Sequence, residues 1–367
     1  MTVPQSGPLT GLKVVEFVGI GPGPHCAMLL ADLGAEVLRI NRPGGNGPRN
    51  PVVDRGRPEL TLDLRRTAHQ KVALDILDRV DILIEGNRPG VMERLGLGPE
   101  VVCKRNPRLV YGRITGWGQE GPLAKSAGHD LAYIALTGAV ASMGLPDAPS
   151  PVPLNLVGDF GGGSLYLAFG IMTALWERQK SGEGQIVDAA ILDGTMSLMA
   201  MFQGFGAAGL LSMNREENFL AGSAPFYRCY FTADGKQMAV SAVEPHFYEL
   251  LLKLIGAPAE WLEDQLDHRL WASRSEAMAK IFASKDRDEW ASILEGTDAC
   301  CAAVLELEEA SRHPQMIARQ AFIEHDGILQ SAPAPRFSRT PGMLQSEPDA
   351  RTMLSSWGLG QLYSELI

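Results

Sequence analysis

Short apolar runs alternate with amphipathic helical patterns over the first 190 residues, and this alternation is the strongest constraint on the fold. The helical patterns PHCAMLLADLG and TAHQKVALDILDRV lie between apolar runs that are rich in β-branched residues and bounded by Gly, Pro or Asn. These runs read KVVEFVG, EVLRIN, DILIEGN and RLVYGRIT. Strands that alternate with helices imply βαβ units, so the sequence predicts an α/β fold with a Rossmann-like, mostly parallel sheet.

The pattern changes from about Ala221 onward. FYRCYFTADGKQMAVSAV predicts two strands joined by an Asp-Gly turn. PHFYELLLKLIG and RSEAMAKIFASKDRDEWASIL then predict short amphipathic helices, and a proline-rich, extended tail follows. We expect a large Rossmann-like domain over residues 1–190, completed by about 331–367, a linker helix over 191–220, and a smaller α+β domain with a return linker over 221–330.

Length and charge limit the class of protein. A chain of 367 residues exceeds the size at which single cores usually stop growing, which favours two domains. The net charge of −10 argues against nucleic acid or an anionic membrane as the main partner. The five cysteines are scattered and odd in number, which indicates reduced thiols. With no secretory signal pattern and no apolar run approaching 18 residues, we expect a cytoplasmic protein.

The first turn, VGIGPGPHC, has the outline of a dinucleotide site but lacks the GxGxxG pattern. The next strand ends in RINRP, with Arg39 and Arg42 in place of an acidic residue for a ribose. The glycines fit close packing of strand and helix, and Arg42 fits the phosphate of NADP or, better, of another phosphorylated adenosine such as coenzyme A. Further arginines at loop positions suit the same chemistry, although any single one fits a solvated surface residue as well: Arg65, Arg88 and Arg94.

Three acidic or imidazole side chains stand among small and apolar residues. His129 and Asp130 occur in AGHDLAY, and Asp159 occurs in LVGDFGGGS. From the residues alone, Asp159 fits a helix N-cap and His129 fits a structural histidine as well as either fits a proton carrier. Glu244, before Pro245, equally fits a helix start.

Six motifs in one order resemble the α-methylacyl-CoA racemases of the family III CoA-transferase superfamily. They read GPGPHCAMLLADLGAEVLRINRPG, LIEGNRPGVMERLGLG, TGWGQEGP, AGHDLAY, LVGDFGGGS and GQIVDAAILDG. The resemblance implies an interlocked homodimer in which the active site lies between the large domain of one chain and the small domain of the other. It assigns catalysis to His129, Asp159 and Glu244. It assigns CoA binding to Arg42, Leu62, Asp63, Leu64, Arg65, Gly86, Asn87, Arg88, Arg94, Gly128, Asp130, Leu131, Ala132 and Tyr133.

The resemblance implies a racemase that interconverts (R)- and (S)-2-methylacyl-CoA thioesters through an enolate, with His129 and Asp159 as bases on opposite faces of the α-carbon. Glu244 would then hydrogen-bond His129. The substrate carries the CoA, and no cofactor is expected. GDFGGGS is expected to open a helix whose free N–H groups near Asp159 or Phe160 stabilise the enolate oxygen. The alternatives are a CoA-transferase with Asp159 as nucleophile and a catalytically idle CoA-binding protein.

Overall fold

The structure is a computed structural model that describes residues 6–345, 347 and 349–364. The chain divides into two compact units. The first unit joins the residues up to Thr137 with Pro153–Leu198 and with the residues from Phe322 onward; the second joins Gly138–Val152 with Met199–Ala321. The stretch 138–152, which the predicted boundaries give to the large domain, thus belongs to the second unit. Among the described residues, every helix is too short or too polar to cross a membrane.

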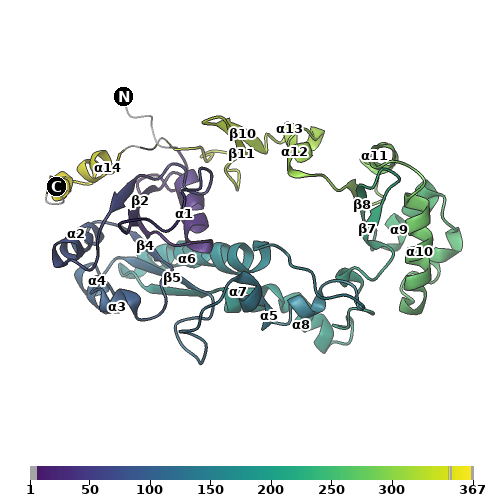
Figure 1. Ribbon diagram of the computed structural model, residues 1–367, viewed down its shortest axis with the longest axis horizontal. Helices are drawn as coiled ribbons and strands as arrows, with labels where there is room; N and C mark the ends of the chain where they lie inside the picture. Colours follow the sequence, from purple (N-terminus) through teal and green to yellow (C-terminus); the bar gives the residue numbers. More distant parts are fainter. Residues whose placement is uncertain (1–5, 346, 348, 365–367) are drawn as a thin grey trace. The chain divides into compact units, whose positions relative to one another are not determined.

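The first unit is built on a six-stranded sheet in the order β3-β2-β1-β4-β5-β6, and every pairing in it is parallel (Figure 1). This confirms the predicted α/β fold class. The four predicted strands are present as β1 (Lys13–Phe17), β2 (Glu36–Asn41), β4 (Ile82–Glu85) and β5 (Val110–Thr115). The short β3 (Glu59–Thr61) and the edge strand β6 (Ile186–Ala190) complete the sheet.

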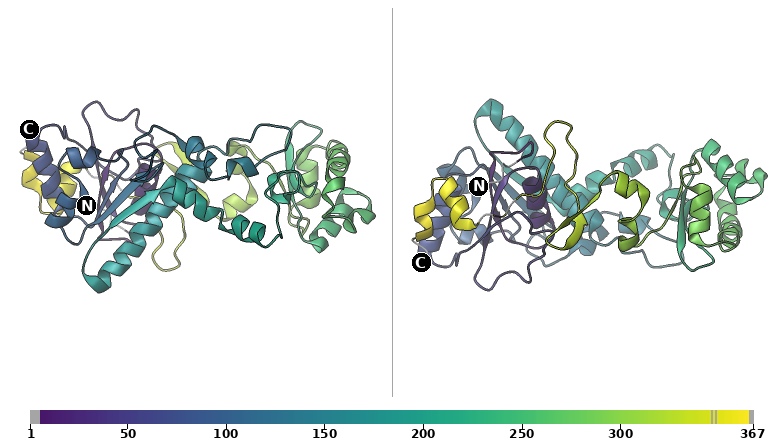
Figure 2. Two further views of the ribbon diagram at one scale, coloured as in Figure 1. Left: turned by 90° about the horizontal axis from the view of Figure 1, so that it is seen from below. Right: turned by 90° about the horizontal axis from the view of Figure 1, so that it is seen from above.

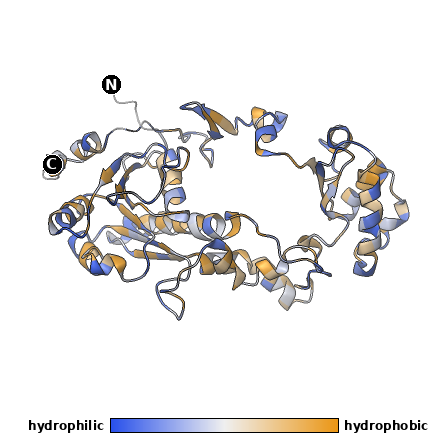
Figure 3. Cartoon of the chain, viewed as in Figure 1, coloured by the Kyte–Doolittle hydropathy of each residue, from blue (hydrophilic) through white to orange (hydrophobic). Residues whose placement is uncertain are grey.

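Helices cover both faces of this sheet, and buried apolar residues of the central strands belong to both layers of the core. Figure 3 colours these strands as largely hydrophobic. On one face, α1 (Pro22–Asp32) and α6 (Tyr166–Ser181) pack against strand residues such as Val14. On the other, Val15 packs with α2 (Thr67–Leu77), α4 (Pro99–Arg105) and the C-terminal helix α14 (Ala350–Ser356). Figure 2 shows the yellow C-terminal helices beside α2. The remaining helices of this unit are α3 (Val91–Arg94), α5 (Asp130–Ala135), α7 (Ile191–Leu198) and α15 (Gly360–Ser364).

The long helix α6 ends at its C-cap residue Gly182, which takes the left-handed conformation (φ 82°) that favours glycine. Its beginning differs from the prediction. A ten-residue π-helix, Leu156–Leu165, runs directly into α6, so the helical segment starts before Asp159. The segment expected as one linker helix over 191–220 contains α7 and α8 (Ala200–Ala207), which meet at Met199, while residues 208–218 are not helical.

The second unit holds a three-stranded antiparallel sheet of β7 (Tyr227–Phe231), β8 (Gln237–Ser241) and β9 (Cys301–Ala303). The predicted Asp-Gly turn joins β7 to β8, with Gly235 at φ 76°. Besides α8, the helices of this unit are α9 (Pro245–Ile255), α10 (Trp271–Phe282), α11 (Arg287–Leu294), α12 (Leu307–Ala310) and α13 (Pro314–Ala318).

After the second unit, the chain returns to the first through the hairpin β10 (Phe322–His325) and β11 (Ile328–Ser331). Arg55 fastens this hairpin to the sheet unit. Its guanidinium forms a buried ion pair with Asp32 (2.6 Å) and donates hydrogen bonds to the Gln330 side chain (2.7 Å) and the Ser331 carbonyl (2.9 Å). The extended tail then leads to α14.

Candidate active site

The strand order of the first unit places a binding crevice between β1 and β4. In a sheet of order 3-2-1-4-5-6, chain connections leave β1 and β4 in opposite directions, and ligands bind outside the carboxyl ends of these strands. A cavity of about 430 Å³ lies at this point. Its walls include the loop after β1, the loop after β4 and two of the candidate catalytic residues: Val18, Gly19 and Ile20; Gly86, Asn87, Arg88 and Pro89; His129 and Asp159.

His129 lines this cavity as the N-cap residue of α5 and is exposed. Its side chain makes neither a cap hydrogen bond nor any other hydrogen bond within the described part of the chain. The structure therefore gives no support to a structural histidine held by its neighbours. Tyr133, one turn later in α5, lies in the same wall, where its hydroxyl donates to the Gly128 carbonyl and its ring meets Trp117 edge-on at 4.8 Å.

Asp159 lies inside the π-helix, not at its N-cap, which is Asn155. The N-cap interpretation of Asp159 was therefore wrong. Its carboxylate accepts a hydrogen bond from the Asn155 amide (3.3 Å), and its own N–H donates to the buried carboxylate of Asp130 (2.6 Å). Burial raises the pKa of Asp159; the Asn155 hydrogen bond opposes this, the negative Asp130 raises the pKa further and His129 lowers it.

The glycines around Asp159 allow close contact with neighbouring helices. A Cβ at Gly158 would lie 2.3 Å from Asp130 Oδ2, and a Cβ at Gly162 would lie 2.5 Å from Thr195 Oγ1 of α7. Any larger residue at either position would push the π-helix away from α5 or α7. The glycine run that resembles a helix start is thus needed for packing along the helix.

The backbone donors expected for the enolate oxygen already have acceptors. The Asp159 N–H is bonded to Asp130, and the Phe160 N–H donates to the Asn155 carbonyl (3.2 Å) in the five-residue pattern of a π-helix. The expectation of free N–H groups at these two residues fails because the helix begins before them, at Leu156.

A second cavity, of about 560 Å³, lies beside the first at the ends of β2 and β3, and Asn87 lines both. Six of the residues assigned to CoA line it: Arg42, Leu62, Asp63, Leu64, Arg65 and Asn87. Four others line the first cavity: Gly86, Arg88, Gly128 and Tyr133. Arg94, Asp130, Leu131 and Ala132 line neither of these two cavities.

The two arginines that line the second cavity, Arg42 and Arg65, make only local contacts, with residues two or three positions away in the chain. The Arg42 Nε donates to the Gly45 carbonyl (2.8 Å), and Arg65 pairs with Asp63 (2.8 Å) while remaining 83% exposed. Both guanidinium groups therefore keep donors at the surface that suit a phosphate group.

Comparison with known proteins over most of the chain shows the family. Residues 9–350 match the model of CoA-transferase family III. The chain belongs to this family. It is 44% identical to the alpha-methylacyl-CoA racemase of Mus musculus over 93% of the chain and 89% of that protein, and 42% identical to the one of Homo sapiens over 91% and 88%. The acetyl-CoA:oxalate CoA-transferase of Acetobacter aceti is 29% identical over 88% of the chain and 87% of that protein.

Solved structures support the fold of this family III chain. A CAIB/BAIF family protein from Brucella suis superimposes with a TM-score of 0.80 at 25% identity, covering 98% of this chain and 100% of the other. Within the family, the chain thus resembles proteins named as racemases more closely than the protein named as an oxalate CoA-transferase.

Asp159 of this family III chain also borders a third cavity, of about 690 Å³, that sequence reasoning missed. Asn155 and Phe160 line it from the π-helix, and polar residues of the loop between β2 and β3 line it from the other side. Asn46 in that loop donates to the Val18 carbonyl. The sequence places Asn155 four residues before Asp159, which was the available signal for a contact between them. The π-helix that brings the two side chains together was not predicted.

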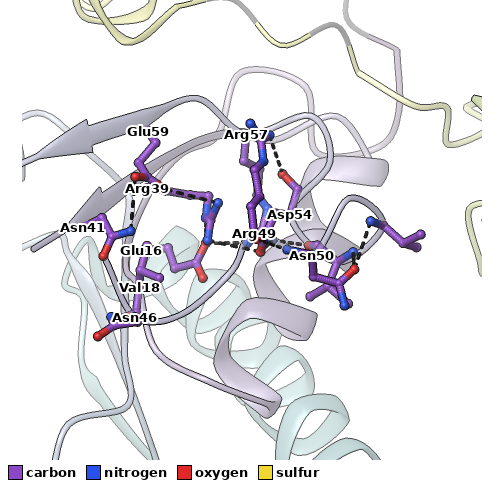
Figure 4. A network of polar contacts seen from close by, with 12 residues as sticks. Glu16, Val18, Arg39, Asn41, Asn46, Arg49, Asn50, Asp54, Arg57 and Glu59 are labelled. Atoms are coloured by element: carbon purple, nitrogen blue, oxygen red, sulfur yellow. Dashed lines mark hydrogen bonds and ion pairs between the residues drawn. The ribbon is translucent and has the colours of Figure 1, made fainter. Parts of the chain in front are cut away.

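A buried ion network, drawn in Figure 4, borders this third cavity, and its members Arg39 and Asp54 line the cavity. Arg57 pairs with Glu16 of β1, and Arg39 of β2 lies 3.6 Å from Glu16 and 3.1 Å from Asp54. Burial raises the pKa of Glu16 and lowers the pKa of Arg57. The network connects β1, β2 and the loop that contains Asp54 at the wall of the cavity.

Two further residues, His25 and the predicted catalytic residue Glu244, are not among the residues that line these cavities. His25 is bonded through Nδ1 to the Ser164 hydroxyl (2.7 Å), and its ring lies 4.5 Å from that of Phe160. Burial is the main cause of the lowered pKa of His25, so this histidine supports the π-helix as a neutral side chain. Glu244 is the exposed N-cap residue of α9 in the second unit and makes no cap hydrogen bond.

Proposed function

We propose that this family III chain is a racemase that interconverts (R)- and (S)-2-methylacyl-CoA thioesters by moving the α-proton. The identity to two alpha-methylacyl-CoA racemases supports this assignment. The structural observation that carries it is that His129 and Asp159 line one cavity at the switch point of the sheet. A transferase that uses Asp159 as a nucleophile has no evident use for a histidine there.

The surroundings of the two residues suit a two-base mechanism. One base removes the α-proton and the other delivers a proton to the opposite face of the enolate. Histidine side chains titrate near neutral pH as a class. The raised pKa of Asp159 brings its carboxyl closer to the same range, so that this residue can also hold and release a proton during turnover.

We assign the CoA moiety to the second cavity and the thioester end to the first. Arg42 and Arg65 would contact the phosphate groups, and the pantetheine chain would pass Asn87 toward His129 and Asp159. CoA enters as part of the substrate, and the proposed proton transfers require no further cofactor.

We also propose a homodimer whose interface completes the site. The outer face of α6, together with Leu165 directly before it, supports an interface because four large apolar side chains, spaced by four, three and four residues, share one exposed stripe. Leu165, Phe169, Met172 and Trp176 are 53%, 68%, 38% and 63% exposed. In the dimer, Glu244 of the partner subunit would hydrogen-bond His129. This contact would fix the tautomer of the imidazole and favour its charged form. We retain the cytoplasm as the proposed location, on the sequence grounds given above.

The test is α-proton exchange. One enantiomer of a 2-methylacyl-CoA is incubated with the protein in D₂O, without an acceptor acid, and followed by NMR. Deuterium at the α-carbon together with inverted configuration is expected. Absence of exchange, with transfer of CoA to an added carboxylic acid, would instead identify a CoA-transferase in which Asp159 acts as the nucleophile.

A further inference from the structure

Asp130 is a buried acid directly after His129 in the chain, and the proton transfers described above do not use it. The residue is 6% exposed and forms the first turn of α5. Its Oδ2 accepts the N–H of Asp159 at 2.6 Å. Its Oδ1 is buried and has no hydrogen-bond partner within the described residues. A buried carboxylate is costly unless it is hydrogen-bonded, so this half-satisfied acid calls for an explanation.

The contact between Asp130 and the π-helix is close. At Gly158, a Cβ would lie 2.3 Å from Asp130 Oδ2 and 2.8 Å from Ile134 Cγ2. The carboxylate therefore rests against the bare backbone of the residue before Asp159. A hydrogen bond from an N–H to an ionised carboxylate is shorter and stronger than one between neutral groups. Asp130 thus fixes the backbone from which the Asp159 side chain extends.

We propose that Asp130 is the positioning residue of the active site: it couples the N-terminus of α5, which presents His129, to the π-helix, which presents Asp159. The inference rests on the proposed function and deepens it. Because Asp130 follows His129 directly and bonds to the Asp159 backbone, one side chain sets the spacing of both bases. A two-base reaction needs this spacing held closely, since a displacement of about 1 Å can cost on the order of 10²-fold in rate.

The charge of Asp130 adds a second effect, because a neighbouring negative charge raises the pKa of Asp159. The reactive pair carries one proton, on His129 in one direction and on Asp159 in the other, so in both directions activity is lost at low pH when both are protonated. The other charged or titratable groups around Asp159 are His129 and Tyr133 at α5, Arg88 after β4, Arg39, Arg49, Asp54 and Glu59 at the third cavity, and His25, which contacts Phe160 from α1.

The experiment compares Asp130→Ala with Asp130→Asn. Alanine removes the acceptor for the Asp159 N–H, and we expect kcat for α-proton exchange to fall by on the order of 10²-fold with little change in KM. Asparagine keeps an oxygen acceptor but removes the charge. It should retain more of kcat than alanine, and the acid limb of its pH profile should move to lower pH. Asp188→Asn is the matched control, because Asp188 also accepts a backbone N–H, that of Gln119 (3.3 Å), away from the cavity.

A folded Asp130→Ala protein with the kcat of the wild type would overturn the inference, and so would an Asp130→Asn protein whose acid limb does not move. If the alanine variant does not fold, as judged by circular dichroism, the asparagine variant decides. A second readout does not depend on activity. In protein labelled with ¹³C at aspartate carboxyls, the resonance that Asp159→Asn removes should titrate at lower pH in Asp130→Asn. If Asp130→Asn shows this titration shift but the wild-type protein shows no α-proton exchange, the racemase is refuted and the coupling of Asp130 to Asp159 is still supported.

Discussion

His129 and Asp159 line the same cavity, but the chain supports them very differently. Asp159 lies in a ten-residue π-helix, receives a hydrogen bond from Asn155, and has its backbone held by Asp130. His129 is exposed at the start of a six-residue helix and has no side-chain hydrogen bond within the described residues. The first unit therefore supplies hydrogen-bond partners to Asp159 but none to the His129 side chain. The proposed contact with Glu244 would give His129 such a partner.

The largest expected effect comes from removing either base. We expect His129→Ala and Asp159→Asn each to lower the rate of racemisation by about 10²- to 10⁴-fold, because each residue transfers a proton in the reaction. The measurement is inversion of configuration, followed by NMR in D₂O.

Exchange without inversion tells the two bases apart. If they act on opposite faces of the α-carbon, His129→Ala should retain slow exchange with one enantiomer and Asp159→Asn with the other. The same enantiomer being exchanged by both variants would contradict the assignment of the bases to opposite faces.

The next largest effect is on the free energy of unfolding, through the buried ion network at the cavity beside Asp159. Arg57→Met leaves the buried carboxylates of Glu16 and Asp54 without this partner, and breaking a buried ion pair typically costs about 3–5 kcal/mol. We expect a clear loss in the urea midpoint. Arg105→Met is the control, because Arg105 also pairs with two carboxylates, those of Asp75 and Asp78, but is 38% exposed; there, about 1 kcal/mol or less is expected. Equal losses in the two variants would mean that burial does not distinguish these ion clusters.

A smaller effect should follow from Glu244→Gln, which tests whether Glu244 supplies the side-chain partner that His129 lacks in the first unit. A hydrogen bond to a charged group contributes about 1.5–3 kcal/mol, which corresponds to a loss of roughly ten- to a hundredfold in kcat. Glu249→Gln, on the exposed face of the same helix α9, should leave kcat unchanged. A Glu244→Gln protein with full kcat would show that His129 works without this carboxylate.

The sequence predicted the two bases and most of the sheet, but not the residues that support Asp159. The strands β1, β2, β4 and β5 were predictable because they are buried apolar runs between amphipathic helices. Three-residue β3 is too short to show a pattern, and β6 carries the exposed Asp188 in its middle. The motifs found His129 and Asp159, but side-chain spacing does not distinguish a π-helix from an α-helix start. The supports of Asp159 were therefore missed, because they depend on that backbone.

The smallest expected effect lies away from both bases, at Arg42. Its guanidinium is exposed and donates to the Gly45 carbonyl, so a phosphate contact there would be screened by solvent. Exposed ion pairs contribute about 0.2–1 kcal/mol, and Arg42→Ala should therefore raise KM for the acyl-CoA by roughly fivefold at most. The rise should shrink as salt is added, while kcat stays at the wild-type value. Arg79→Ala, at an exposed position of the same unit outside the described cavities, is the control. A fall in kcat with Arg42→Ala would mean that the CoA end of the site also sets the geometry of the two bases, so that binding and chemistry are not separate functions of the two ends.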